Sequence, residues 1–194
     1  MIASRCQAAT QQQQITTSSA PRSRAYPDEP RVGVGVVVFR KPVTIGQAPE
    51  VLLIRRAKEP AKGQWCFPGG SLELGETLAS CAVREVMEET GVQIRNNQGV
   101  ASVSSEGFSK SLQQPTPFAA VDSINPDDTG RLKFHYVVVE ATAMAADPQA
   151  QPVASDDVDA VQWLEVHKLR SLDNLTRNCA RLAEEACERF DLGS

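Results

Sequence analysis

The stretch that decides the fold reads Gly70-Ser-Leu-Glu-Leu-Gly-Glu76, followed after seven residues by Arg84-Glu-Val-Met-Glu-Glu-Thr-Gly-Val92. A helix advances about 100° per residue, so an arc of roughly 100° contains Glu85, Glu88 and Glu89. The apolar side of the same helix consists of Ala79, Ala82, Val83, Val86 and Met87. The spacing predicts an amphipathic helix over about residues 77 to 90 that ends at Gly91 as a left-handed stop.

Three glutamates on a helix would, by themselves, indicate an ordinary solvated face. The residues around them resemble the box of the Nudix hydrolase family, whose fixed positions are all present: Gly70, Glu76, Arg84, Glu85, Glu88, Glu89 and Gly91. Seven fixed residues coincide by chance with a probability on the order of 10⁻⁸ per window. The resemblance implies an α/β fold, a Nudix-type α/β/α sandwich with a mixed β-sheet in a single domain.

The resemblance also implies a site for Mg²⁺ or Mn²⁺, cations that prefer hard oxygen ligands and bridge carboxylates to substrate phosphates. By resemblance Glu89 is a metal ligand, Glu85 is either a ligand or the general base, and Glu88 completes a second metal or orients water. The Gly69 carbonyl joins the ligands by the same resemblance, although a tight turn alone would also explain Gly69. Clustered carboxylates repel one another, so at least one should have a raised pKa without metal.

The remaining fixed positions of the box have supporting roles in the family. Arg84 and Glu76 are expected to form an ion pair that holds the loop against the helix. Gly70 and Gly91 are expected to shape the turns before and after that helix.

Two further groups are candidates for the reaction. Asp157, with Asp156 close behind, stands where many family members carry an acid before a tryptophan strand, although a solvated turn is an equally good interpretation. Arg55 and Arg56 end a strand whose basic residues contact substrate phosphates in similar proteins. Strand alternation sends these two to opposite faces, and we expect Arg56 to face inward.

The composition limits the other classes of function. The 194 residues suit one domain with extensions, and the net charge of -4 provides no basic surface for duplex nucleic acid. No apolar run approaches the roughly 20 residues of a membrane span. Five cysteines without a Cys-x-x-Cys pair and two histidines make a zinc site improbable and indicate packed thiols. The expected partner is a small nucleotide, with a homodimer as one option for assembly.

The first thirty residues differ from the rest of the chain. They contain a glutamine run, a Ser/Thr cluster, three arginines and no acid before Asp28. Such a segment does not fold alone, and it is typical either of an organelle transit peptide, for a mitochondrion or chloroplast, or of a disordered tail on a cytoplasmic protein. We therefore expect an N-terminal extension over residues 1–30 and the Nudix domain, with a C-terminal helix, over residues 31–194.

The rest of the chain alternates strand-like and helix-like patterns. Strands are predicted over 31–40, 51–56, 99–104, 117–124, 131–144 and 158–165. The turn chemistry of Asn125-Pro-Asp-Asp-Thr-Gly130 predicts a hairpin between the strands that flank it. A last helix is predicted from Ser171 or Asp173 to Arg189.

Three functions remain open. The leading one is a metal-dependent hydrolase that cleaves the pyrophosphate bond of a nucleoside diphosphate linked to another moiety, with ADP-ribose giving AMP and ribose 5-phosphate. The stretches 130–140 and 155–163 resemble the ADP-ribose pyrophosphatase group, whereas the late position of Pro115 and Pro117 argues against that substrate. The alternatives are a house-cleaning (d)NTP pyrophosphohydrolase that releases NMP and pyrophosphate, and a non-catalytic nucleotide-binding module.

Overall fold

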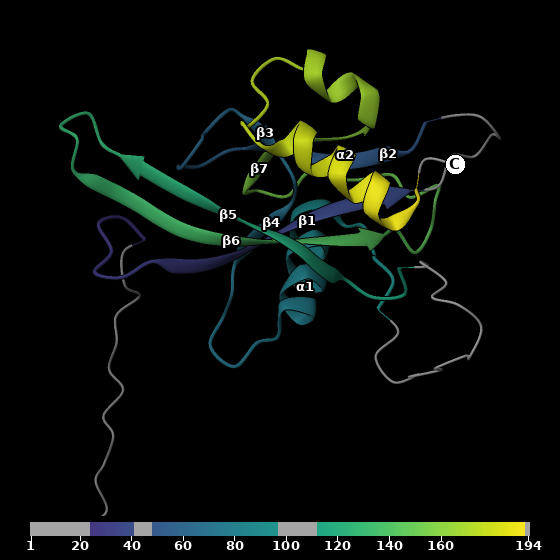
Figure 1. Ribbon diagram of the computed structural model, residues 1–194, viewed down its shortest axis with the longest axis horizontal. Coiled ribbons are helices and arrows are strands. Elements are labelled where there is room, and N and C mark those ends of the chain that lie inside the picture. Colours follow the sequence, from purple (N-terminus) through teal and green to yellow (C-terminus); the bar gives the residue numbers. More distant parts are fainter. Residues whose placement is uncertain (1–23, 41–47, 97–111, 193–194) are drawn as a thin grey trace, which may run out of the picture.

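The computed structural model describes residues 24–40, 48–96 and 112–192 (Figure 1). In chain order, its elements are β1 (Arg31–Arg40), β2 (Glu50–Arg56), β3 (Trp65–Cys66), β4 (Gly69–Ser71), α1 (Leu78–Thr90), β5 (Thr116–Pro126), β6 (Leu132–Met144), β7 (Val158–Glu165), the 3₁₀ helix η1 (Val166–Ser171) and α2 (Cys179–Phe190). The predicted strands over 31–40, 51–56, 117–124, 131–144 and 158–165 are thereby confirmed to within two residues at each end. The predicted strand over 99–104 lies outside the described residues.

The sheet is mixed and has β1 at its centre. β1 runs parallel to β6 from the pair Arg31 and Tyr136 to the pair Phe39 and Met144, and antiparallel to β2 and β4 on its other side. β5 pairs with β6, and β7 and β3 pair with β2, which gives the order β3-β2-β1-β6-β5 with β4 and β7 off this path. The short β4 lies beside β1, so the glycine turn before α1 becomes part of the sheet.

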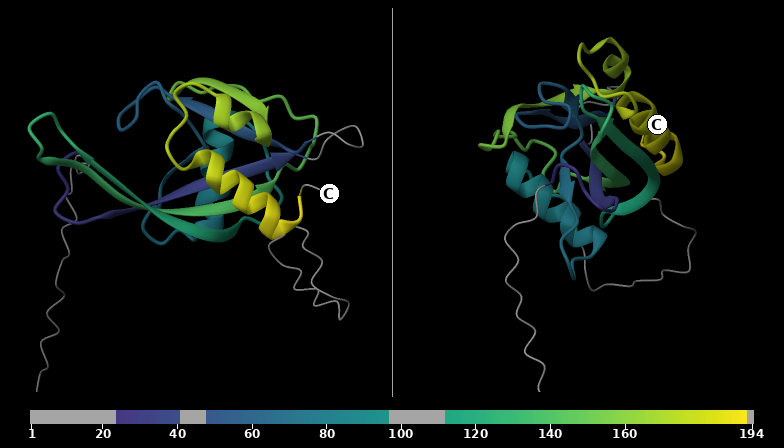
Figure 2. Two further views of the ribbon diagram at one scale, coloured as in Figure 1. Left: turned by 45° about the horizontal axis from the view of Figure 1, so that its top comes forward. Right: turned by 90° about the vertical axis from the view of Figure 1, so that its left-hand side faces the viewer.

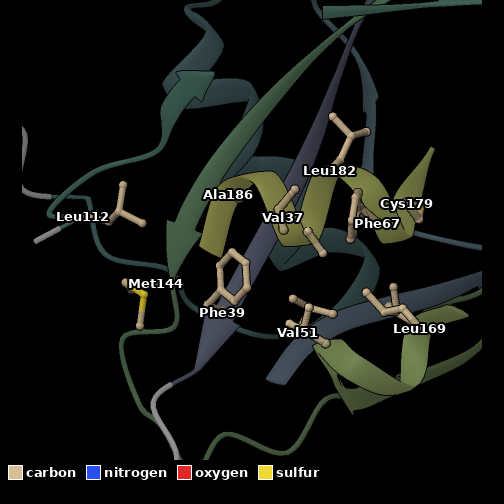
Figure 3. Close-up of a cluster of buried hydrophobic side chains, with 13 residues drawn as sticks. Val37, Phe39, Val51, Phe67, Leu112, Met144, Leu169, Cys179, Leu182 and Ala186 are labelled. Carbon is tan, nitrogen blue, oxygen red and sulfur yellow. The ribbon is translucent and has the colours of Figure 1, made fainter. Parts of the chain in front are cut away.

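Successive residues of β1 point to opposite faces of the sheet, and each face is covered by a different helix (Figure 2). Val34, Val36 and Val38 pack with the buried side of α1. Val37 and Phe39 pack with α2 and η1, and Figure 3 shows them beside Val51, Phe67, Leu169, Leu182 and Ala186. β1 is buried from Gly33 to Phe39 because both of its faces are covered, which explains its nearly continuous β-branched sequence.

α1 begins and ends as the sequence predicts. Thr77 is extended and its side chain accepts a hydrogen bond from the Ser80 amide, and Gly91 adopts the left-handed conformation with φ of 66°. The buried residues of the helix are Cys81, Ala82, Val86 and Thr90. Met87, which we placed on the apolar side, is 45% exposed, so the buried face is narrower than the spacing suggested.

β5 and β6 form the predicted hairpin, and its tip extends away from the helices (Figures 1 and 2). The Asp127 carboxylate accepts hydrogen bonds from the backbone amides of Thr129 and Arg131, which fixes the turn. The Tyr26 hydroxyl donates to the same carboxylate, and the Tyr26 ring lies under the Arg131 guanidinium. This contact ties the segment before β1 to the hairpin.

The prediction for the last helix was wrong at its start. Residues 166–171 form the 3₁₀ helix, and α2 begins only at Cys179. The backbone between these two helices is hydrogen-bonded to β3. The Trp65 amide donates to the Asn174 carbonyl, and the Thr176 amide donates to the Trp65 carbonyl. Asn174 has a left-handed φ of 58°. A helix through this segment would lose its bonds to β3. Within the described residues, no helix has the length and apolar character to cross a membrane.

Candidate active site

The turn at Gly69 and Gly70 brings α1 against the centre of the sheet. Gly69 pairs with Gly35 of β1, and Gly70 pairs with Val34. A Cβ at position 69 would lie 2.1 Å from the Val34 carbonyl oxygen, and one at position 70 would lie 2.3 Å from a Glu85 carboxylate oxygen. Both glycines are therefore required by close approach, Gly69 to the β1 backbone and Gly70 to Glu85.

Glu89 is the glutamate most closely bound to this turn. Its Oε2 accepts a hydrogen bond of 2.8 Å from the Gly69 amide. Burial raises the pKa of Glu89 to about 7, and the neighbouring Glu85 raises it further, whereas the Gly69 hydrogen bond and Arg56 oppose the shift. The carboxyl group is thus held in a place where it exchanges a proton near neutral pH.

Glu85 lies beside Glu89 and against the Gly70 backbone. Burial raises the pKa of Glu85, an effect that its hydrogen bond with Arg84 opposes. Two desolvated carboxyl groups on one side of a turn make a strong site for positive charge, because a bound cation would compensate the charge that burial disfavours.

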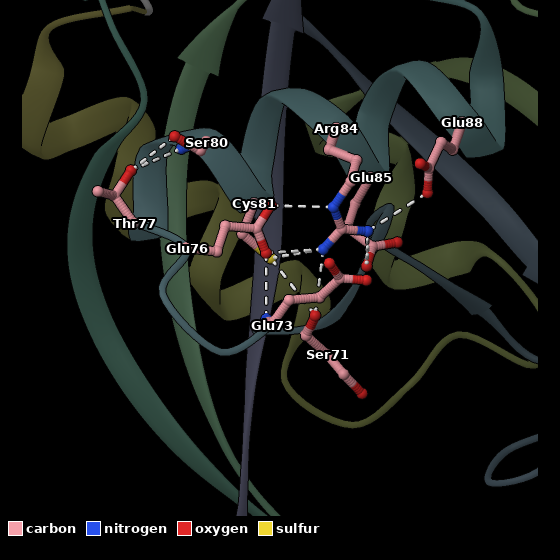
Figure 4. A network of polar contacts seen from close by, with 9 residues as sticks. All are labelled: Ser71, Glu73, Glu76, Thr77, Ser80, Cys81, Arg84, Glu85 and Glu88. Atoms are coloured by element: carbon pink, nitrogen blue, oxygen red, sulfur yellow. Dashed lines mark hydrogen bonds and ion pairs between the residues drawn. The ribbon is translucent and has the colours of Figure 1, made fainter. Parts of the chain in front are cut away.

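Arg84 supplies part of that positive charge in the described structure (Figure 4). The expected ion pair with Glu76 is present and bidentate, with N–O distances of 2.9 and 2.8 Å. The same guanidinium donates to Glu85 at 2.7 Å, to Glu88 at 3.3 Å and to the Ser71 carbonyl at 3.2 Å. The bond to Arg84 lowers the pKa of Glu76 to about 2. Arg84 therefore holds the loop to α1 and also forms ion pairs with Glu85 and Glu88.

Glu88 differs most from the expected arrangement. Its side chain is 60% exposed and forms an ion pair with Arg84. Across the described ranges, no three His, Cys, Asp or Glu side chains lie close enough to hold a metal ion. The donors are nevertheless carboxylates, which suit a hard divalent cation. Glu85 and Glu89 lie against the glycine turn, and the exposed Glu88 follows Glu85 by one helical turn.

The two candidate arginines lie in different surroundings. Arg55 is exposed, and its guanidinium lies 5.8 Å from the centre of the Trp65 ring. Arg56 is partly buried, donates to the Pro60 carbonyl at 2.7 Å and acts electrostatically on both Glu89 and Cys66. The structure therefore places Arg56, rather than Arg55, on the side of the acids. Burial raises the pKa of Cys66 to about 12, so this thiol is packed and not activated.

Asp157 lies at the edge of the same region and bears on the charge of Glu89. Its carboxylate forms an ion pair with Lys58, and both side chains are about two-thirds exposed, at 65% and 68%. Sequence reasoning missed Lys58. The available signal in the sequence was the position of Lys58, two residues beyond Arg56. The pairing of β2 with β7 brings its loop near Asp157.

Glu140 of β6 is a second residue that sequence reasoning missed. It pairs with Gly35 and is only 6% exposed, and burial raises its pKa to about 7. Among the residues that the structure describes, its Oε2 and the hydroxyl of Thr142 find no hydrogen-bond partner. A Cβ at position 35 would lie 2.4 Å from Glu140 Oε2, so a side chain at this position of β1 would collide with the carboxyl group.

The NUDIX domain family matches residues 29–185 of this chain. The chain therefore belongs to the Nudix family, and its mixed sheet between two helices is the α/β arrangement that the resemblance implied. A MutT NUDIX hydrolase from Burkholderia pseudomallei has a similar structure, with a TM-score of 0.55 at 27% identity, over 81% of this chain and 98% of that one.

Two relatives are named for different activities. An ADP-ribose pyrophosphatase of Methanocaldococcus jannaschii is 44% identical over 55 residues, which cover 27% of this chain and 32% of that protein. The 8-oxo-dGDP phosphatase NUDT18 of Homo sapiens is 30% identical over 113 residues, which cover 43% of this chain and 35% of that protein. The matched segments thus span about a third of the length of each of these relatives.

Proposed function

We propose that this protein is a metal-dependent pyrophosphohydrolase that cleaves the diphosphate of a nucleoside diphosphate linked to another moiety. The reaction adds one water across the P–O–P bond, so ADP-ribose would give AMP and ribose 5-phosphate. The observation that carries this proposal is the placement of Glu89 and Glu85 against Gly69 and Gly70, within a complete family box.

Glu85, Glu88 and Glu89 would hold Mg²⁺ or Mn²⁺, with the Gly69 carbonyl as a further ligand. When bound, the cation would neutralise the diphosphate and polarise the phosphorus under attack. Glu88 would reach the cation by leaving Arg84, since that contact is long at 3.3 Å and exposed to solvent. Arg84 would keep its bidentate bond to the well-covered Glu76, so the loop would stay in place.

The other polar groups of the site suit the two needs of hydrolysis, which are a proton acceptor and compensation of phosphate charge. Glu85 or Asp157 would take the proton of the attacking water, because both are carboxyl groups within the electrostatic range of Glu89. Arg56 would face the substrate phosphates, since its side chain lies on the side of the acids. Arg55 would lie farther out and contact the distal part of the substrate beside Trp65.

The test is a panel of nucleotide derivatives incubated with Mg²⁺ and resolved by chromatography. ADP-ribose should give equal amounts of AMP and ribose 5-phosphate, turnover should stop in EDTA, and added Mg²⁺ or Mn²⁺ should restore it. Glu89→Gln should reduce kcat by at least about a hundredfold, because it removes a charged ligand at the centre of the site. Undiminished turnover in EDTA would refute the metal mechanism.

A second candidate is a house-cleaning hydrolase for (d)NTPs or oxidised nucleotides, and the similarity to an 8-oxo-dGDP phosphatase favours its inclusion. The products separate the two candidates: a triphosphate would release pyrophosphate and a nucleoside monophosphate. If the panel showed nucleotide binding without metal-dependent turnover of any member, the non-catalytic module would replace both.

A further inference from the structure

Lys58 and Asp157 form an ion pair across two loops that are 99 residues apart in sequence. Lys58 lies in the loop between β2 and β3, and Asp157 lies immediately before β7. Antiparallel pairing of Arg56 with Val158 brings the two loops together. The pair is therefore a product of the sheet and not of local sequence.

Both loops are held at the site by contacts independent of this ion pair. The Val153 amide donates to the Thr90 carbonyl at 2.9 Å and the Ser155 amide to the Glu89 carbonyl at 3.3 Å, which ties the loop before β7 to the end of α1. On the other side, Arg56 Nε donates to the Pro60 carbonyl. Loss of the ion pair would leave both loops in place, so its two members are free to exchange partners.

The energetics favour exchange when a phosphate is present. An ion pair with two-thirds of each side chain exposed contributes little to stability, because water screens both charges. A diphosphate brings more negative charge and more acceptor oxygens than one carboxylate, and a lysine ammonium on a flexible stem binds phosphate as a point charge. Lys58 thus brings a cation on a flexible, exposed side chain to the edge of the site, whereas Arg56 and Arg84 are hydrogen-bonded within the protein, to the Pro60 carbonyl and to Glu76.

We propose that Lys58 is a phosphate-binding residue of this site. When the substrate binds, the Lys58 ammonium breaks its ion pair with Asp157 and binds the diphosphate instead. The Asp157 carboxylate is then free to face the reacting phosphate. This inference rests on the proposed function. It assigns to one residue two coupled effects: retention of the diphosphate, and release of an acid that is otherwise neutralised.

The direct test measures binding rather than turnover, with imidodiphosphate as a non-hydrolysable diphosphate and isothermal calorimetry in Mg²⁺. Lys58→Gln should weaken binding about tenfold, because it removes a charge-assisted hydrogen bond. Lys58→Arg should stay within about threefold of the parent. Lys62→Gln is the matched control, since Lys62 is an exposed lysine of the same loop, and it should change binding less than twofold. Equal binding by the parent and Lys58→Gln would overturn the inference.

A double-mutant cycle separates a direct contact from an effect through the ion pair. In an Asp157→Asn background, Lys58→Gln should still weaken imidodiphosphate binding about tenfold. If the loss disappeared in that background, Lys58 would act only by neutralising Asp157, and the assignment as a phosphate ligand would be wrong.

Turnover distinguishes a failure of this inference from a failure of the proposed function. Lys58→Gln should raise KM about tenfold with products unchanged, whereas Lys62→Gln should leave KM as it is. A parent that hydrolyses its substrate with metal, beside a Lys58→Gln variant of equal KM, would remove the role of Lys58 and leave the hydrolase assignment standing. If the parent bound imidodiphosphate through Lys58 but hydrolysed no substrate, the phosphate-binding role of Lys58 would stand and the hydrolase assignment would be wrong.

Discussion

Gly35 and Glu140 are coupled by a distance that leaves no room for a side chain between them. A Cβ at position 35 would come within 2.4 Å of the Glu140 carboxylate, which is buried. At Gly33 the nearest atom to such a Cβ is the Gly70 carbonyl oxygen at 3.4 Å. The two glycines of β1 therefore differ in the space beside them, although they alternate regularly in the sequence: only Gly35 is tightly confined.

Gly35→Ala should lower the free energy of unfolding by about 2 kcal/mol, the usual range for an overpacked core. Gly33→Ala is the control and should change it by less than about 0.5 kcal/mol, because its neighbours need to yield little. Urea unfolding measures both. In a Glu140→Ala background the cost of Gly35→Ala should largely disappear, and an unchanged cost there would show that the carboxylate is not the obstacle.

Glu140 should also make stability depend on pH. Its pKa is about 7 in the folded protein against 4.5 in the unfolded chain, so between these values the unfolded chain releases a proton that the folded protein keeps. The free energy of unfolding should fall as pH rises from 4.5 to 7, by a total of about 3 kcal/mol, and then level off. Glu140→Gln should remove the Glu140 share of this fall in urea titrations with EDTA at pH 5 and pH 8 and leave the share of Glu89, whose pKa is also about 7, whereas Glu188→Gln, at an exposed site, should retain both.

Asp157→Asn tests the acid at the edge of the site. The substitution keeps the shape and removes the charge, so a proton acceptor would be lost while the fold is unaffected. We expect kcat to fall more than tenfold, measured by steady-state kinetics on the best substrate of the panel. A kcat within about threefold of the parent would end the catalytic role of Asp157 and leave a solvated turn before β7.

At the scale of elements, α1 is the part that aligns the acids with the glycine turn. Its start depends on Thr77, whose side-chain oxygen accepts from the Ser80 amide at 3.1 Å. Thr77→Ala should lower the free energy of unfolding by about 1 kcal/mol, the common cost of a lost N-cap. Ser80→Ala keeps the amide donor and should cost less. Urea unfolding that ranked the two in the opposite order would place the cap elsewhere.

Most of the elements were predictable because their signals are local. The spacing of Glu85, Glu88 and Glu89 and the left-handed Gly91 define α1, and the turn chemistry around Asp127 defines the hairpin. The start of α2 was not predictable, because the periodicity of its apolar residues continues into a segment whose backbone bonds to Trp65. Such long-range competition leaves no trace in a single stretch of sequence.

The candidate site was predictable to a similar degree. The box located Glu85 and Glu89 at the turn and the Arg84 pair with Glu76. It did not reveal that Arg84 also draws Glu88, or that Lys58 pairs with Asp157, because both contacts depend on side-chain reach across the folded structure. The roles of these residues in catalysis stay predictions.

For the whole molecule, a bound cation should be linked to both pH and stability. The pKa of Glu89 is about 7, so Glu89 must lose a proton before it binds a cation in neutral or acidic solution. Mg²⁺ should raise the melting temperature more at pH 8 than at pH 6, since the ionised form is the one that binds. Differential scanning fluorimetry checks this, with NaCl at matched ionic strength as the control. An equal shift at the two pH values, or one retained in Glu89→Gln, would contradict the linkage.

The position of Arg84 bears on how the proposed cation site would behave before a cation binds. One guanidinium spans three acidic side chains and a backbone carbonyl, so mutual repulsion among those acids is already compensated in the bare polypeptide. Uptake of a divalent ion is then a substitution of counterions on a finished scaffold, with no segment that must fold around the incoming charge. The Arg84 contacts should consequently keep the loop beside α1 in EDTA as well as in Mg²⁺.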